Sequence, residues 1–366
     1  LFCRLVAVLH VPASKSPKMH GPYSLAGVVR LPGGTQTMKN LPKLLVLELW
    51  GLGDLAIASS FINKATQSFQ VTVVAKSYAH DLRPLLWPDA KVLSWHAPWT
   101  AFRGKYRFDR WPWKSLHQTL STLRSQRFDV AVSARWDPRD HLFMWFTKAS
   151  QRVGFPRRGS QWFLTQGIPM PPDQAHRFNQ WSLVGQRIGV DVPVYQPQES
   201  IEKTIGLDQP PRCVVHSGAA QPVREWPLDR FLGLLDWLES AKIEVLLICD
   251  KHQRPWWEAH QKKVCVPQSV GELASAMKSC RAFVGNDSGP GHLAAAMGLP
   301  TLSIFGPQRT EWFRPAHPGG MVVEGADCPY KPCFDACRFE TPHCLEDVST
   351  EQVLEQLKAF VKIHLS

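Results

Sequence analysis

The 366-residue chain contains no run of 18 consecutive apolar residues, which excludes a membrane-spanning helix of ordinary length. It also shows no internal period, so solenoid and fibrous architectures are excluded. Hydrophobic residues make up 44% and charged residues 20% of the chain, which excludes a wholly disordered protein. The length exceeds one ordinary core and indicates two domains of usual size.

Acidic residues are absent from the first 40 positions and scarce in the first half of the chain. Residues 41–175 hold 18 Lys or Arg against 9 acids, whereas residues 213–366 hold 15 against 18. The net charge of +11 therefore comes from the N-terminal half. This asymmetry favours an anionic partner for that half alone, and with no RNA-binding motif present we expect no nucleic-acid partner.

Residues 1–39 lack helical or strand periodicity, and the chain does not begin with Met. The apolar stretch 5–11 is short for the core of a signal peptide. We expect residues 1–39 to be a disordered leader or a mis-assigned start, with Met19 or Met38 as the alternative beginnings.

Two stretches alternate strand and helix patterns, and they are separated by a segment rich in Pro and Gln at 189–212. In the first, residues 40–188, we expect strands at 44–49, 71–75, 92–95 and 129–134, with helices at 55–67, 77–86 and 114–126. In the second, residues 213–348, we expect strands at 213–217, 244–250, 282–287 and 301–305, with helices at 228–240, 270–280 and 291–297. Residues 349–366 are expected to form a C-terminal helix. The pattern predicts an α/β protein with two Rossmann-like doubly wound parallel sheets facing a central cleft.

The segment FVGNDSGPGHLAAAMGLPTLSIFG at 283–306 joins a buried strand to a helix. Asp287 or Ser288 can cap the helix, and Gly289 and Gly291 allow a ligand to approach the backbone closely. The free N–H groups of a helix start suit a diphosphate, and His292 adds a donor in the first turn. The same residues are also ordinary helix-start chemistry, so the segment alone leaves both interpretations open.

Two further segments follow the first strands of the two domains. In HSGAAQPVREWP at 216–227, Arg224 is either a bidentate ligand of a leaving diphosphate or a solvated surface cation. In WGLGD at 50–54, Gly53 permits a sharp turn and Asp54 opens the helix, either as a cap or as a general base across the cleft. A helix start stabilises a carboxylate and thereby weakens it as a base, so the two roles of Asp54 compete.

Together these segments resemble glycosyltransferase family 9, the bacterial heptosyltransferase family of lipopolysaccharide core assembly. The resemblance rests on LLVLELWGLGDLAIASSF (44–61), HSGAAQPVREWP (216–227) and VGNDSGPGHLAAAMGLPTLSIFGPQ (284–308), and it covers about residues 43–362. It implies a GT-B fold and an inverting, metal-independent transfer from a nucleotide-activated sugar, typically ADP-heptose. The acceptor it implies is the anionic inner core of lipopolysaccharide, reached from the cytoplasmic face of the inner membrane.

Carried over by position, the resemblance makes Asp54 the catalytic base. It places a nucleotide-diphosphate site at Asp287, Ser288, Gly289, Gly291 and His292, with Arg224 where the family more often has Lys. Many members have Arg where this chain has Glu48 and a small polar residue where it has Trp50. These departures concern the identity of the sugar and the acceptor more than the fold.

Asp-x-Asp, the pair with which many metal-using glycosyltransferases hold Mg²⁺ or Mn²⁺, occurs nowhere in the sequence. We therefore expect no catalytic cofactor. The charge of the leaving diphosphate must then be met by the helix start, Arg224 and His292.

The stretch WHAPWTAFRGKYRFDRWPWK at 95–114 interleaves aromatic and basic residues. Such a stretch suits the headgroup region of an anionic bilayer, or else forms a partly packed loop with solvated charges. We expect acceptor contacts from Gly53, Arg103, Arg107 and Arg135, with Arg139, Arg157 and Arg158 as further candidates.

Four cysteines gather near the end of the chain, at Cys328, Cys333, Cys337 and Cys344. Four thiolates this close suit structural zinc or an iron–sulfur cluster, but the spacing lacks the usual Cys-x2-Cys pairs. Free thiols and disulfides remain alternatives.

The leading hypothesis is an inverting glycosyltransferase acting on an anionic envelope glycolipid. Two alternatives stand beside it. One is a GT-B-like transferase or epimerase that uses another nucleotide sugar, and the other is a non-catalytic relative that binds glycans or membranes.

Overall fold

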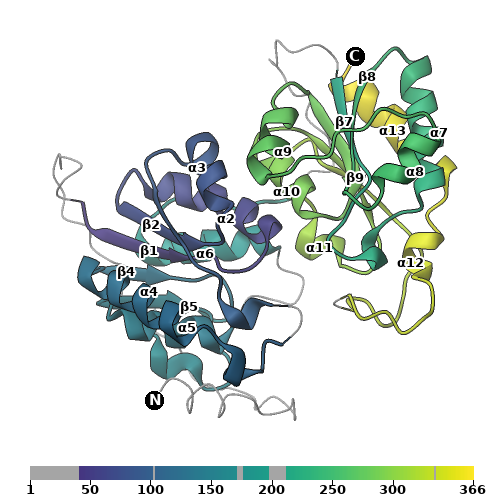
Figure 1. Cartoon of the computed structure of the whole chain (residues 1–366). Helices are drawn as coiled ribbons and strands as arrows, with labels where there is room; N and C mark the ends of the chain where they lie inside the picture. Colours follow the sequence, from purple (N-terminus) through teal and green to yellow (C-terminus); the bar gives the residue numbers. More distant parts are fainter. Residues whose placement is uncertain (1–40, 102–103, 171–175, 198–211, 334) are drawn as a thin grey trace.

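A computed structural model describes residues 41–101, 104–170, 176–197, 212–333 and 335–366. The chain forms two lobes joined through one interface, with the N-terminal lobe in purple and teal and the C-terminal lobe in green and yellow (Figure 1). Each lobe contains one parallel sheet covered by helices, so the predicted pair of parallel-sheet α/β domains is confirmed.

The N-terminal sheet is entirely parallel and has the strand order β3-β2-β1-β4-β5-β6. Its strands are β1 (Lys43–Leu47), β2 (Gln70–Ala75), β3 (Lys91–Ser94), β4 (Val130–Val132), β5 (Gln151–Gly154) and β6 (Gln166–Gly167). The apolar runs predicted as buried strands lie at the centre of this sheet, where β1 is buried from Leu44 onward. Strands β5 and β6 at one edge were not predicted.

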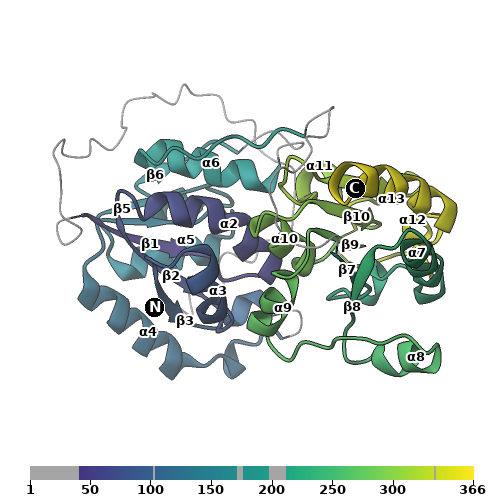
Figure 2. The ribbon, with the colours of Figure 1, turned by 90° about the horizontal axis from the view of Figure 1, so that it is seen from above.

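The helices of this lobe are α2 (Leu52–Ala65), α3 (Ala79–Leu86), α4 (Trp113–Gln126), α5 (Pro138–Thr147) and α6 (Arg177–Ile188). Short 3₁₀ helices lie at η2 (Pro98–Thr100), η3 (Phe108–Arg110) and η4 (Ser160–Phe163). Helices α2 and α6 cover one face of the sheet and α4 and α5 the other (Figure 2). This is the layering of a doubly wound domain.

The C-terminal sheet is also parallel, with the order β11-β10-β9-β7-β8. Its strands are β7 (Arg212–His216), β8 (Glu244–Ile248), β9 (Ala282–Asn286), β10 (Thr301–Phe305) and β11 (Met321–Glu324). The helices are α7 (Leu228–Ser240), α8 (Arg254–Ala259), α9 (Val270–Met277), α10 (Gly289–Ala296), α11 (Thr310–Phe313), α12 (His343–Glu346) and α13 (Thr350–His364), with 3₁₀ helix η5 at Pro222–Arg224. The predicted C-terminal helix is α13, and its apolar face joins the core of this lobe.

The lobes meet where the first turns of α2 and α10 pack against each other (Figure 2). A Cβ on Gly53 would lie 2.9 Å from Cδ2 of His292, and one on Gly289 would lie 3.2 Å from Cβ of Leu52. An added side chain at either glycine would therefore require a neighbouring side chain or one of the two helices to move. Within the described ranges, every helix is too short or too polar to cross a bilayer.

Candidate active site

The two sheets bring chemically active residues to the same side of the molecule, beyond the carboxyl ends of their strands. In the N-terminal sheet the strand order reverses between the neighbouring parallel strands β1 and β4, and Asp54 and Arg135 follow these two strands. In the C-terminal sheet the neighbours β7 and β9 lead to Gly218 and to Ser288. Such points of reversal are where open parallel sheets bind ligands.

Asp54 lies in the first turn of α2 and is bonded through both carboxylate oxygens. Oδ1 accepts a hydrogen bond from Nη1 of Arg135 at 2.7 Å, and Oδ2 accepts one from the backbone N–H of Gly51 at 3.2 Å. Burial opposes ionisation, but Arg135 and Arg177 outweigh it and hold the pKa of Asp54 below its usual range. The side chain is 22% exposed, so an ionised carboxylate still reaches the surface.

Two more carboxyl groups lie behind Asp54 and are held by Trp50. Its backbone N–H donates to Oε1 of Glu48 at 3.3 Å, and its indole Nε1 donates to Oδ2 of Asp140 at 3.1 Å. Burial, reinforced by the nearby acids, raises the pKa of Glu48 to about 8 and that of Asp140 to about 7. Below about pH 7 the negative charge of this group therefore concentrates on Asp54.

The start of α10 faces this carboxylate from the other lobe. Ser288 is the N-cap residue, and Gly289, Gly291 and His292 form the first turn. Among the described residues, Oγ of Ser288 and Nδ1 of His292 are buried and have no hydrogen-bond partner. Burial lowers the pKa of His292 to about 4, so its imidazole is neutral and offers one N–H. These polar atoms beside a helix start fit an anionic ligand.

Arg224 also lies near the start of α10, and its guanidinium is hydrogen-bonded to acidic side chains. Its Nε and Nη2 donate to the two carboxylate oxygens of Asp335 at 2.6 and 2.9 Å, and Nη1 lies 3.3 Å from Oδ2 of Asp287. Burial raises the pKa of Asp287 to about 6, although Arg224 opposes that shift. The structure thus brings Arg224 and Asp287 together as predicted, and adds Asp335 as a partner that the sequence did not indicate.

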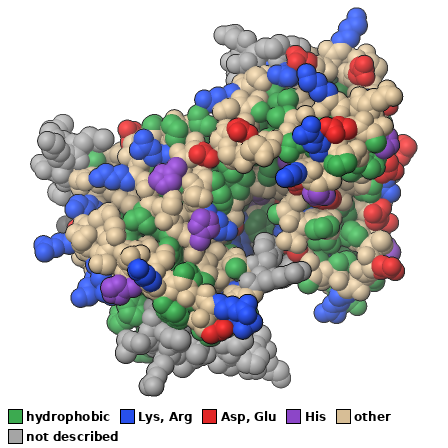
Figure 3. Space-filling model, viewed as in Figure 1, with side chains coloured by type: hydrophobic (Ala, Val, Ile, Leu, Met, Phe, Trp, Pro, Cys, Tyr) green, Lys and Arg blue, Asp and Glu red, His purple; other side chains and the backbone are tan. Residues whose placement is uncertain are grey.

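A cavity of about 630 Å³ opens between the lobes beside the start of α10. Its lining comes from both lobes and includes Tyr78 and Asp81 from the N-terminal lobe with His216, Asp250 and Pro290 from the C-terminal lobe. The molecular surface is hollowed between the two lobes (Figure 3). A cavity of this size that ends at a helix start fits a nucleotide-sized ligand.

Asp250 follows β8 and is the lining residue that sequence reasoning missed. Its carboxylate packs directly against Gly218, where any side chain would collide with it. The sequence did contain a signal for this residue, because an acid directly after a buried strand is typical of a ligand-binding position. The sequence pattern had instead placed Asp250 inside the strand, which ends at Ile248.

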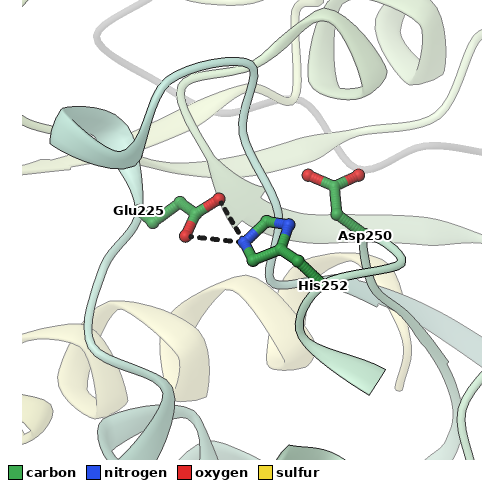
Figure 4. Close-up of side chains that lie close together, drawn as sticks. All are labelled: Glu225, Asp250 and His252. Atoms are coloured by element: carbon green, nitrogen blue, oxygen red, sulfur yellow. Dashed lines mark hydrogen bonds and ion pairs between the residues drawn. The ribbon is translucent and has the colours of Figure 1, made fainter. Parts of the chain in front are cut away.

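Near Asp250, the described residues contain one group of three side chains whose metal-ligating atoms lie within 4.8 Å of one another. The group consists of Glu225, Asp250 and His252. Nε2 of His252 lies 3.3 Å from Glu225, and Asp250 lies on the other side of the imidazole ring (Figure 4). The imidazole lies between the two carboxylate side chains, and Asp250 joins this cluster to the lining of the cavity.

A second, smaller cavity of about 150 Å³ lies in the N-terminal lobe next to the Asp54–Arg135 pair. Its polar lining is cationic, with Arg135, Arg139, Arg157 and Arg158, and its aromatic lining includes Tyr106 and Trp136. The acid in the lining, Asp137, is paired with Arg139 at 2.6 Å. This cavity therefore suits an anionic ligand with a sugar-like face.

The predicted acceptor residues divide around this cavity. Arg135 lines it, and Gly53 lies at the interface of the two lobes. Arg107 does not line it and pairs with Asp109 at 3.2 Å on the surface. Arg103 lies outside the described residues.

The aromatic residues of 95–114 are only partly available to a bilayer. Trp95, Trp99 and Trp111 are buried in the core of the N-terminal lobe, and Nε1 of Trp99 donates to Asp140 at 2.7 Å. Tyr106 is half exposed. Most of the aromatic surface expected from this stretch is therefore internal packing.

The four clustered cysteines share the lining of one small cavity beyond β11, together with Lys331 and His343. All four thiols are free, and burial raises the pKa of Cys344 to about 11. Asp335, the partner of Arg224, lies between Cys333 and Cys337, so this loop adjoins the site at the start of α10.

Two facing Rossmann-like lobes with a nucleotide-sized cavity between them define a protein of the GT-B class. The family model "Glycosyltransferase family 9 (heptosyltransferase)" matches residues 116–343, and the chain belongs to this family. The resemblance recognised in the sequence is thereby confirmed.

A curated relative, lipooligosaccharide heptosyltransferase 2 of Campylobacter jejuni, is 30% identical over 102 residues, which cover 28% of this chain and 32% of the relative. The sequence match therefore spans about a third of that relative. The glycosyltransferase family 9 structure from Veillonella parvula superposes with a TM-score of 0.69 at 18% identity, covering 88% of this chain and 97% of that one. The Escherichia coli heptosyltransferase WaaC with ADP gives 0.67 at 13% identity, covering 87% and 99%.

A solved structure with a lower TM-score is that of an iron-containing glycosyltransferase. The iron-containing dodecameric glycosyltransferase TibC of enterotoxigenic Escherichia coli superposes with a TM-score of 0.53 at 15% identity, covering 88% of this chain and 76% of that one. At this identity the likeness concerns the fold.

Proposed function

We propose that the chain is an inverting, metal-independent glycosyltransferase. It moves a sugar, heptose from ADP-heptose, to an anionic lipopolysaccharide-core or related envelope glycan. The acceptor is lipid-linked, and the protein works as a peripheral protein at the cytoplasmic face of the inner membrane. The observation that carries the proposal is the position of Asp54. It lies in the first turn of α2, which packs against the start of α10 beside a cavity lined by both lobes.

The donor is proposed to occupy the cavity between the lobes. Its nucleoside lies against Asp250, because a carboxylate at a strand end accepts hydrogen bonds from ribose hydroxyls. Its diphosphate lies at the start of α10, where Ser288 and His292 present polar atoms without protein partners among the described residues. Arg224 adds a positive charge beside them, stabilised in place by Asp335.

The acceptor is proposed to occupy the cationic cavity, with its nucleophilic hydroxyl facing Asp54. Asp54 takes the proton of that hydroxyl as the oxygen attacks the anomeric carbon from the face opposite the diphosphate. The bond between the anomeric carbon and the diphosphate oxygen breaks, and the nucleoside diphosphate leaves with the electron pair. The helix start and Arg224 stabilise the charge that develops on it.

The test combines donor binding with product stereochemistry. ADP-heptose, UDP-sugars and GDP-sugars are each added to the protein, and the shift in melting temperature is compared. ADP-heptose is expected to give the largest shift, and proton NMR of the product is expected to show an inverted anomeric centre. Transfer is expected to persist in EDTA. Retention of configuration would refute the general-base role of Asp54.

The departures at Glu48 and Trp50 support a second candidate, a GT-B transferase or epimerase with a different nucleotide sugar. Both residues belong to the surroundings of Asp54: Glu48 interacts electrostatically with it, and the ring of Trp50 lies against Arg135, the partner of Asp54. In that case a UDP- or GDP-sugar gives the largest shift in the same panel. A relative that binds glycans without transferring sugar would show a donor or acceptor shift with no product.

We also propose that the loop of Cys328, Cys333, Cys337 and Cys344 holds a structural zinc ion or an iron–sulfur cluster. The support is the gathering of four free thiols around one small cavity. Among the described residues no three of these sulfur atoms lie within 4.8 Å of one another, so binding would have to draw them closer together. Elemental analysis of the purified protein, with Cys333→Ser as the comparison, tests this: a stoichiometric metal lost in the variant is expected.

A further inference from the structure

An aromatic surface patch lies on the N-terminal lobe, where α5 meets η4. It consists of Trp145, Phe146, Trp162 and Phe163. Trp162 is 81% exposed and Trp145 is 37% exposed. The ring centroid of Trp145 lies 5.0 Å from that of Phe146 and 6.1 Å from that of Phe163, so these three rings form one group. Trp162 directly precedes Phe163 in the chain. Grouped aromatic side chains at the surface mark an interaction site more often than single ones do.

Basic side chains surround the aromatic patch and are attached to it. Nε of Arg124 donates to the backbone oxygen of Phe146 at 2.6 Å, and its guanidinium lies 5.9 Å from that ring. Nε of Arg152 donates to the backbone oxygen of Phe163 at 2.8 Å. Lys148 is exposed at the end of α5. The cations thus lie at the edges of the aromatic surface.

Cations outnumber acids in the segments that build this face. The acids there are Asp129, which accepts a hydrogen bond from the backbone N–H of Lys43, Asp137, which is paired with Arg139, and the buried Asp140. Residues 114–128 and 141–170 contain no Asp or Glu, while they contribute seven cations. These are Lys114, Arg124, Arg127, Lys148, Arg152, Arg157 and Arg158. The face therefore has an unbalanced positive charge next to exposed indoles, which matches an anionic surface.

The aromatic patch and the cationic cavity proposed for the acceptor belong to the same elements. Helix α5 begins at the cavity with Pro138 and carries Trp145 in its last turn, and Arg157 and Arg158 of the cavity directly precede η4. From Pro138 to Trp145 the helix rises about 10 Å, so a surface that contacts the patch lies within about two helical turns of the cavity.

We propose that the α4–α5–η4 face is the membrane-docking surface of the protein, and that its partner is an anionic lipid bilayer. Trp side chains favour the headgroup level of a bilayer, and Lys and Arg are attracted to anionic lipids. If two copies of the chain met through this face, the cations of one would lie against the cations of the other. This repulsion disfavours a self-complementary dimer. The inference rests on the proposed function for its purpose, since docking here delivers a lipid-linked acceptor to the cavity.

The experiment measures cosedimentation of the full chain with vesicles of phosphatidylcholine alone and of phosphatidylcholine with 30% phosphatidylglycerol. Two variants remove the proposed contacts: Trp145→Ser with Trp162→Ser, and Arg127→Gln with Lys148→Gln. Matched controls on the other lobe are Phe339→Ser, which removes a partly exposed aromatic, and Lys358→Gln with Lys362→Gln, which removes two exposed cations of α13. Melting temperatures verify that each variant is folded.

The wild type and both controls are expected to bind the anionic vesicles and to bind phosphatidylcholine weakly. Removal of two cations is expected to weaken binding by roughly 25-fold, from about 1 kcal/mol per cation near an anionic surface. The aromatic variant is expected to weaken binding to both kinds of vesicle. Equal binding by wild type and patch variants, or tighter binding to single-stranded nucleic acid than to anionic vesicles, would overturn the proposal.

A second measurement separates this inference from the proposed function. Transfer to a short, water-soluble acceptor is expected to be unchanged in the patch variants, while transfer to an acceptor embedded in vesicles falls with binding. If no donor supports transfer to any acceptor but the vesicle results hold, the proposed function fails and the docking surface stands. Transfer that falls equally on both acceptors would contradict docking as the role of this face.

Discussion

Arg135 and Asp54 form a short ion pair, with Nη1 of the guanidinium 2.7 Å from Oδ1 of the carboxylate. The two residues lie 81 positions apart and follow the neighbouring strands β4 and β1. Arg135 also lines the cationic cavity, and its guanidinium lies 4.5 Å from the ring centre of Trp50. The same cation therefore contacts the candidate base and the candidate acceptor site, and an anionic acceptor group would compete with Asp54 for it.

Replacing Asp54 with Asn is expected to reduce kcat by about 10²- to 10⁴-fold, the range typical of a lost general base. The Asn side chain keeps an oxygen that can accept the hydrogen bond from Gly51 but loses the ion pair with Arg135, so the melting temperature should fall while donor affinity changes little. Steady-state kinetics and donor titration give these values. Asp109→Asn, at an exposed acid on the surface loop, is the matched control and should behave as wild type. A fully active Asp54→Asn variant would refute the base.

Replacing Arg135 with Met is expected to shift the acidic limb of the kcat/KM profile to higher pH. Asp54 must be ionised to act as a base, and Arg135 holds its pKa below the usual range. Without the guanidinium the carboxylate gains its proton at a higher pH, so activity disappears earlier on acidification. Arg135→Lys keeps the positive charge, so its acidic limb should move less than that of Arg135→Met. Arg110→Gln, an exposed cation, should leave the limb in place; an unmoved limb in Arg135→Met would contradict the coupling.

The sequence predicted the central strands and both helix starts because apolar runs followed by Gly, Asp and Ser are local signals. It did not predict β6, which has two residues, or β5, whose first two residues are only partly buried. It identified Asp54 and Arg135 separately, in different roles. Their pairing depends on β1 and β4 being neighbours, which is a property of the sheet order and leaves no local pattern. The partnership of Arg224 with Asp335 was hidden for the same reason, since 111 positions separate them.

Replacing Glu48 with Gln is expected to stabilise the protein increasingly as the pH rises from about 4.5 to about 8. Burial raises the pKa of Glu48 to about 8, so the folded state holds a proton that the unfolded state releases above about pH 4.5. The stability contributed by the neutral carboxyl is complete below the unfolded pKa and is lost as the pH rises through the folded pKa. The advantage of Gln should grow by at most ~1.4 kcal/mol per pH unit within this window.

Chemical denaturation of both proteins at pH 4, 6 and 8 measures that difference. The control is Glu355→Gln, at an exposed acid of α13 in the C-terminal lobe. A constant difference between Glu48→Gln and wild type from pH 4 to pH 8 would show that Glu48 is ionised in the folded protein.

Replacing Gly53 with Ala is expected to lower both activity and stability, although Ala is the better helix former. The added Cβ would lie 2.9 Å from Cδ2 of His292, so α2 and α10 must separate or the imidazole must move. Overpacking of this kind typically costs about 1–3 kcal/mol. Gly291→Ala is the control for stability: it lies in the same first turn of α10, and its Cβ would contact only residues of the C-terminal lobe, none closer than 3.4 Å. Thermal denaturation compares the two variants, and turnover is compared between Gly53→Ala and wild type. The close approach of the two helices positions Asp54 opposite the start of α10. If Gly53→Ala had wild-type stability and turnover, the two lobes would have to work at a greater separation than the structure shows.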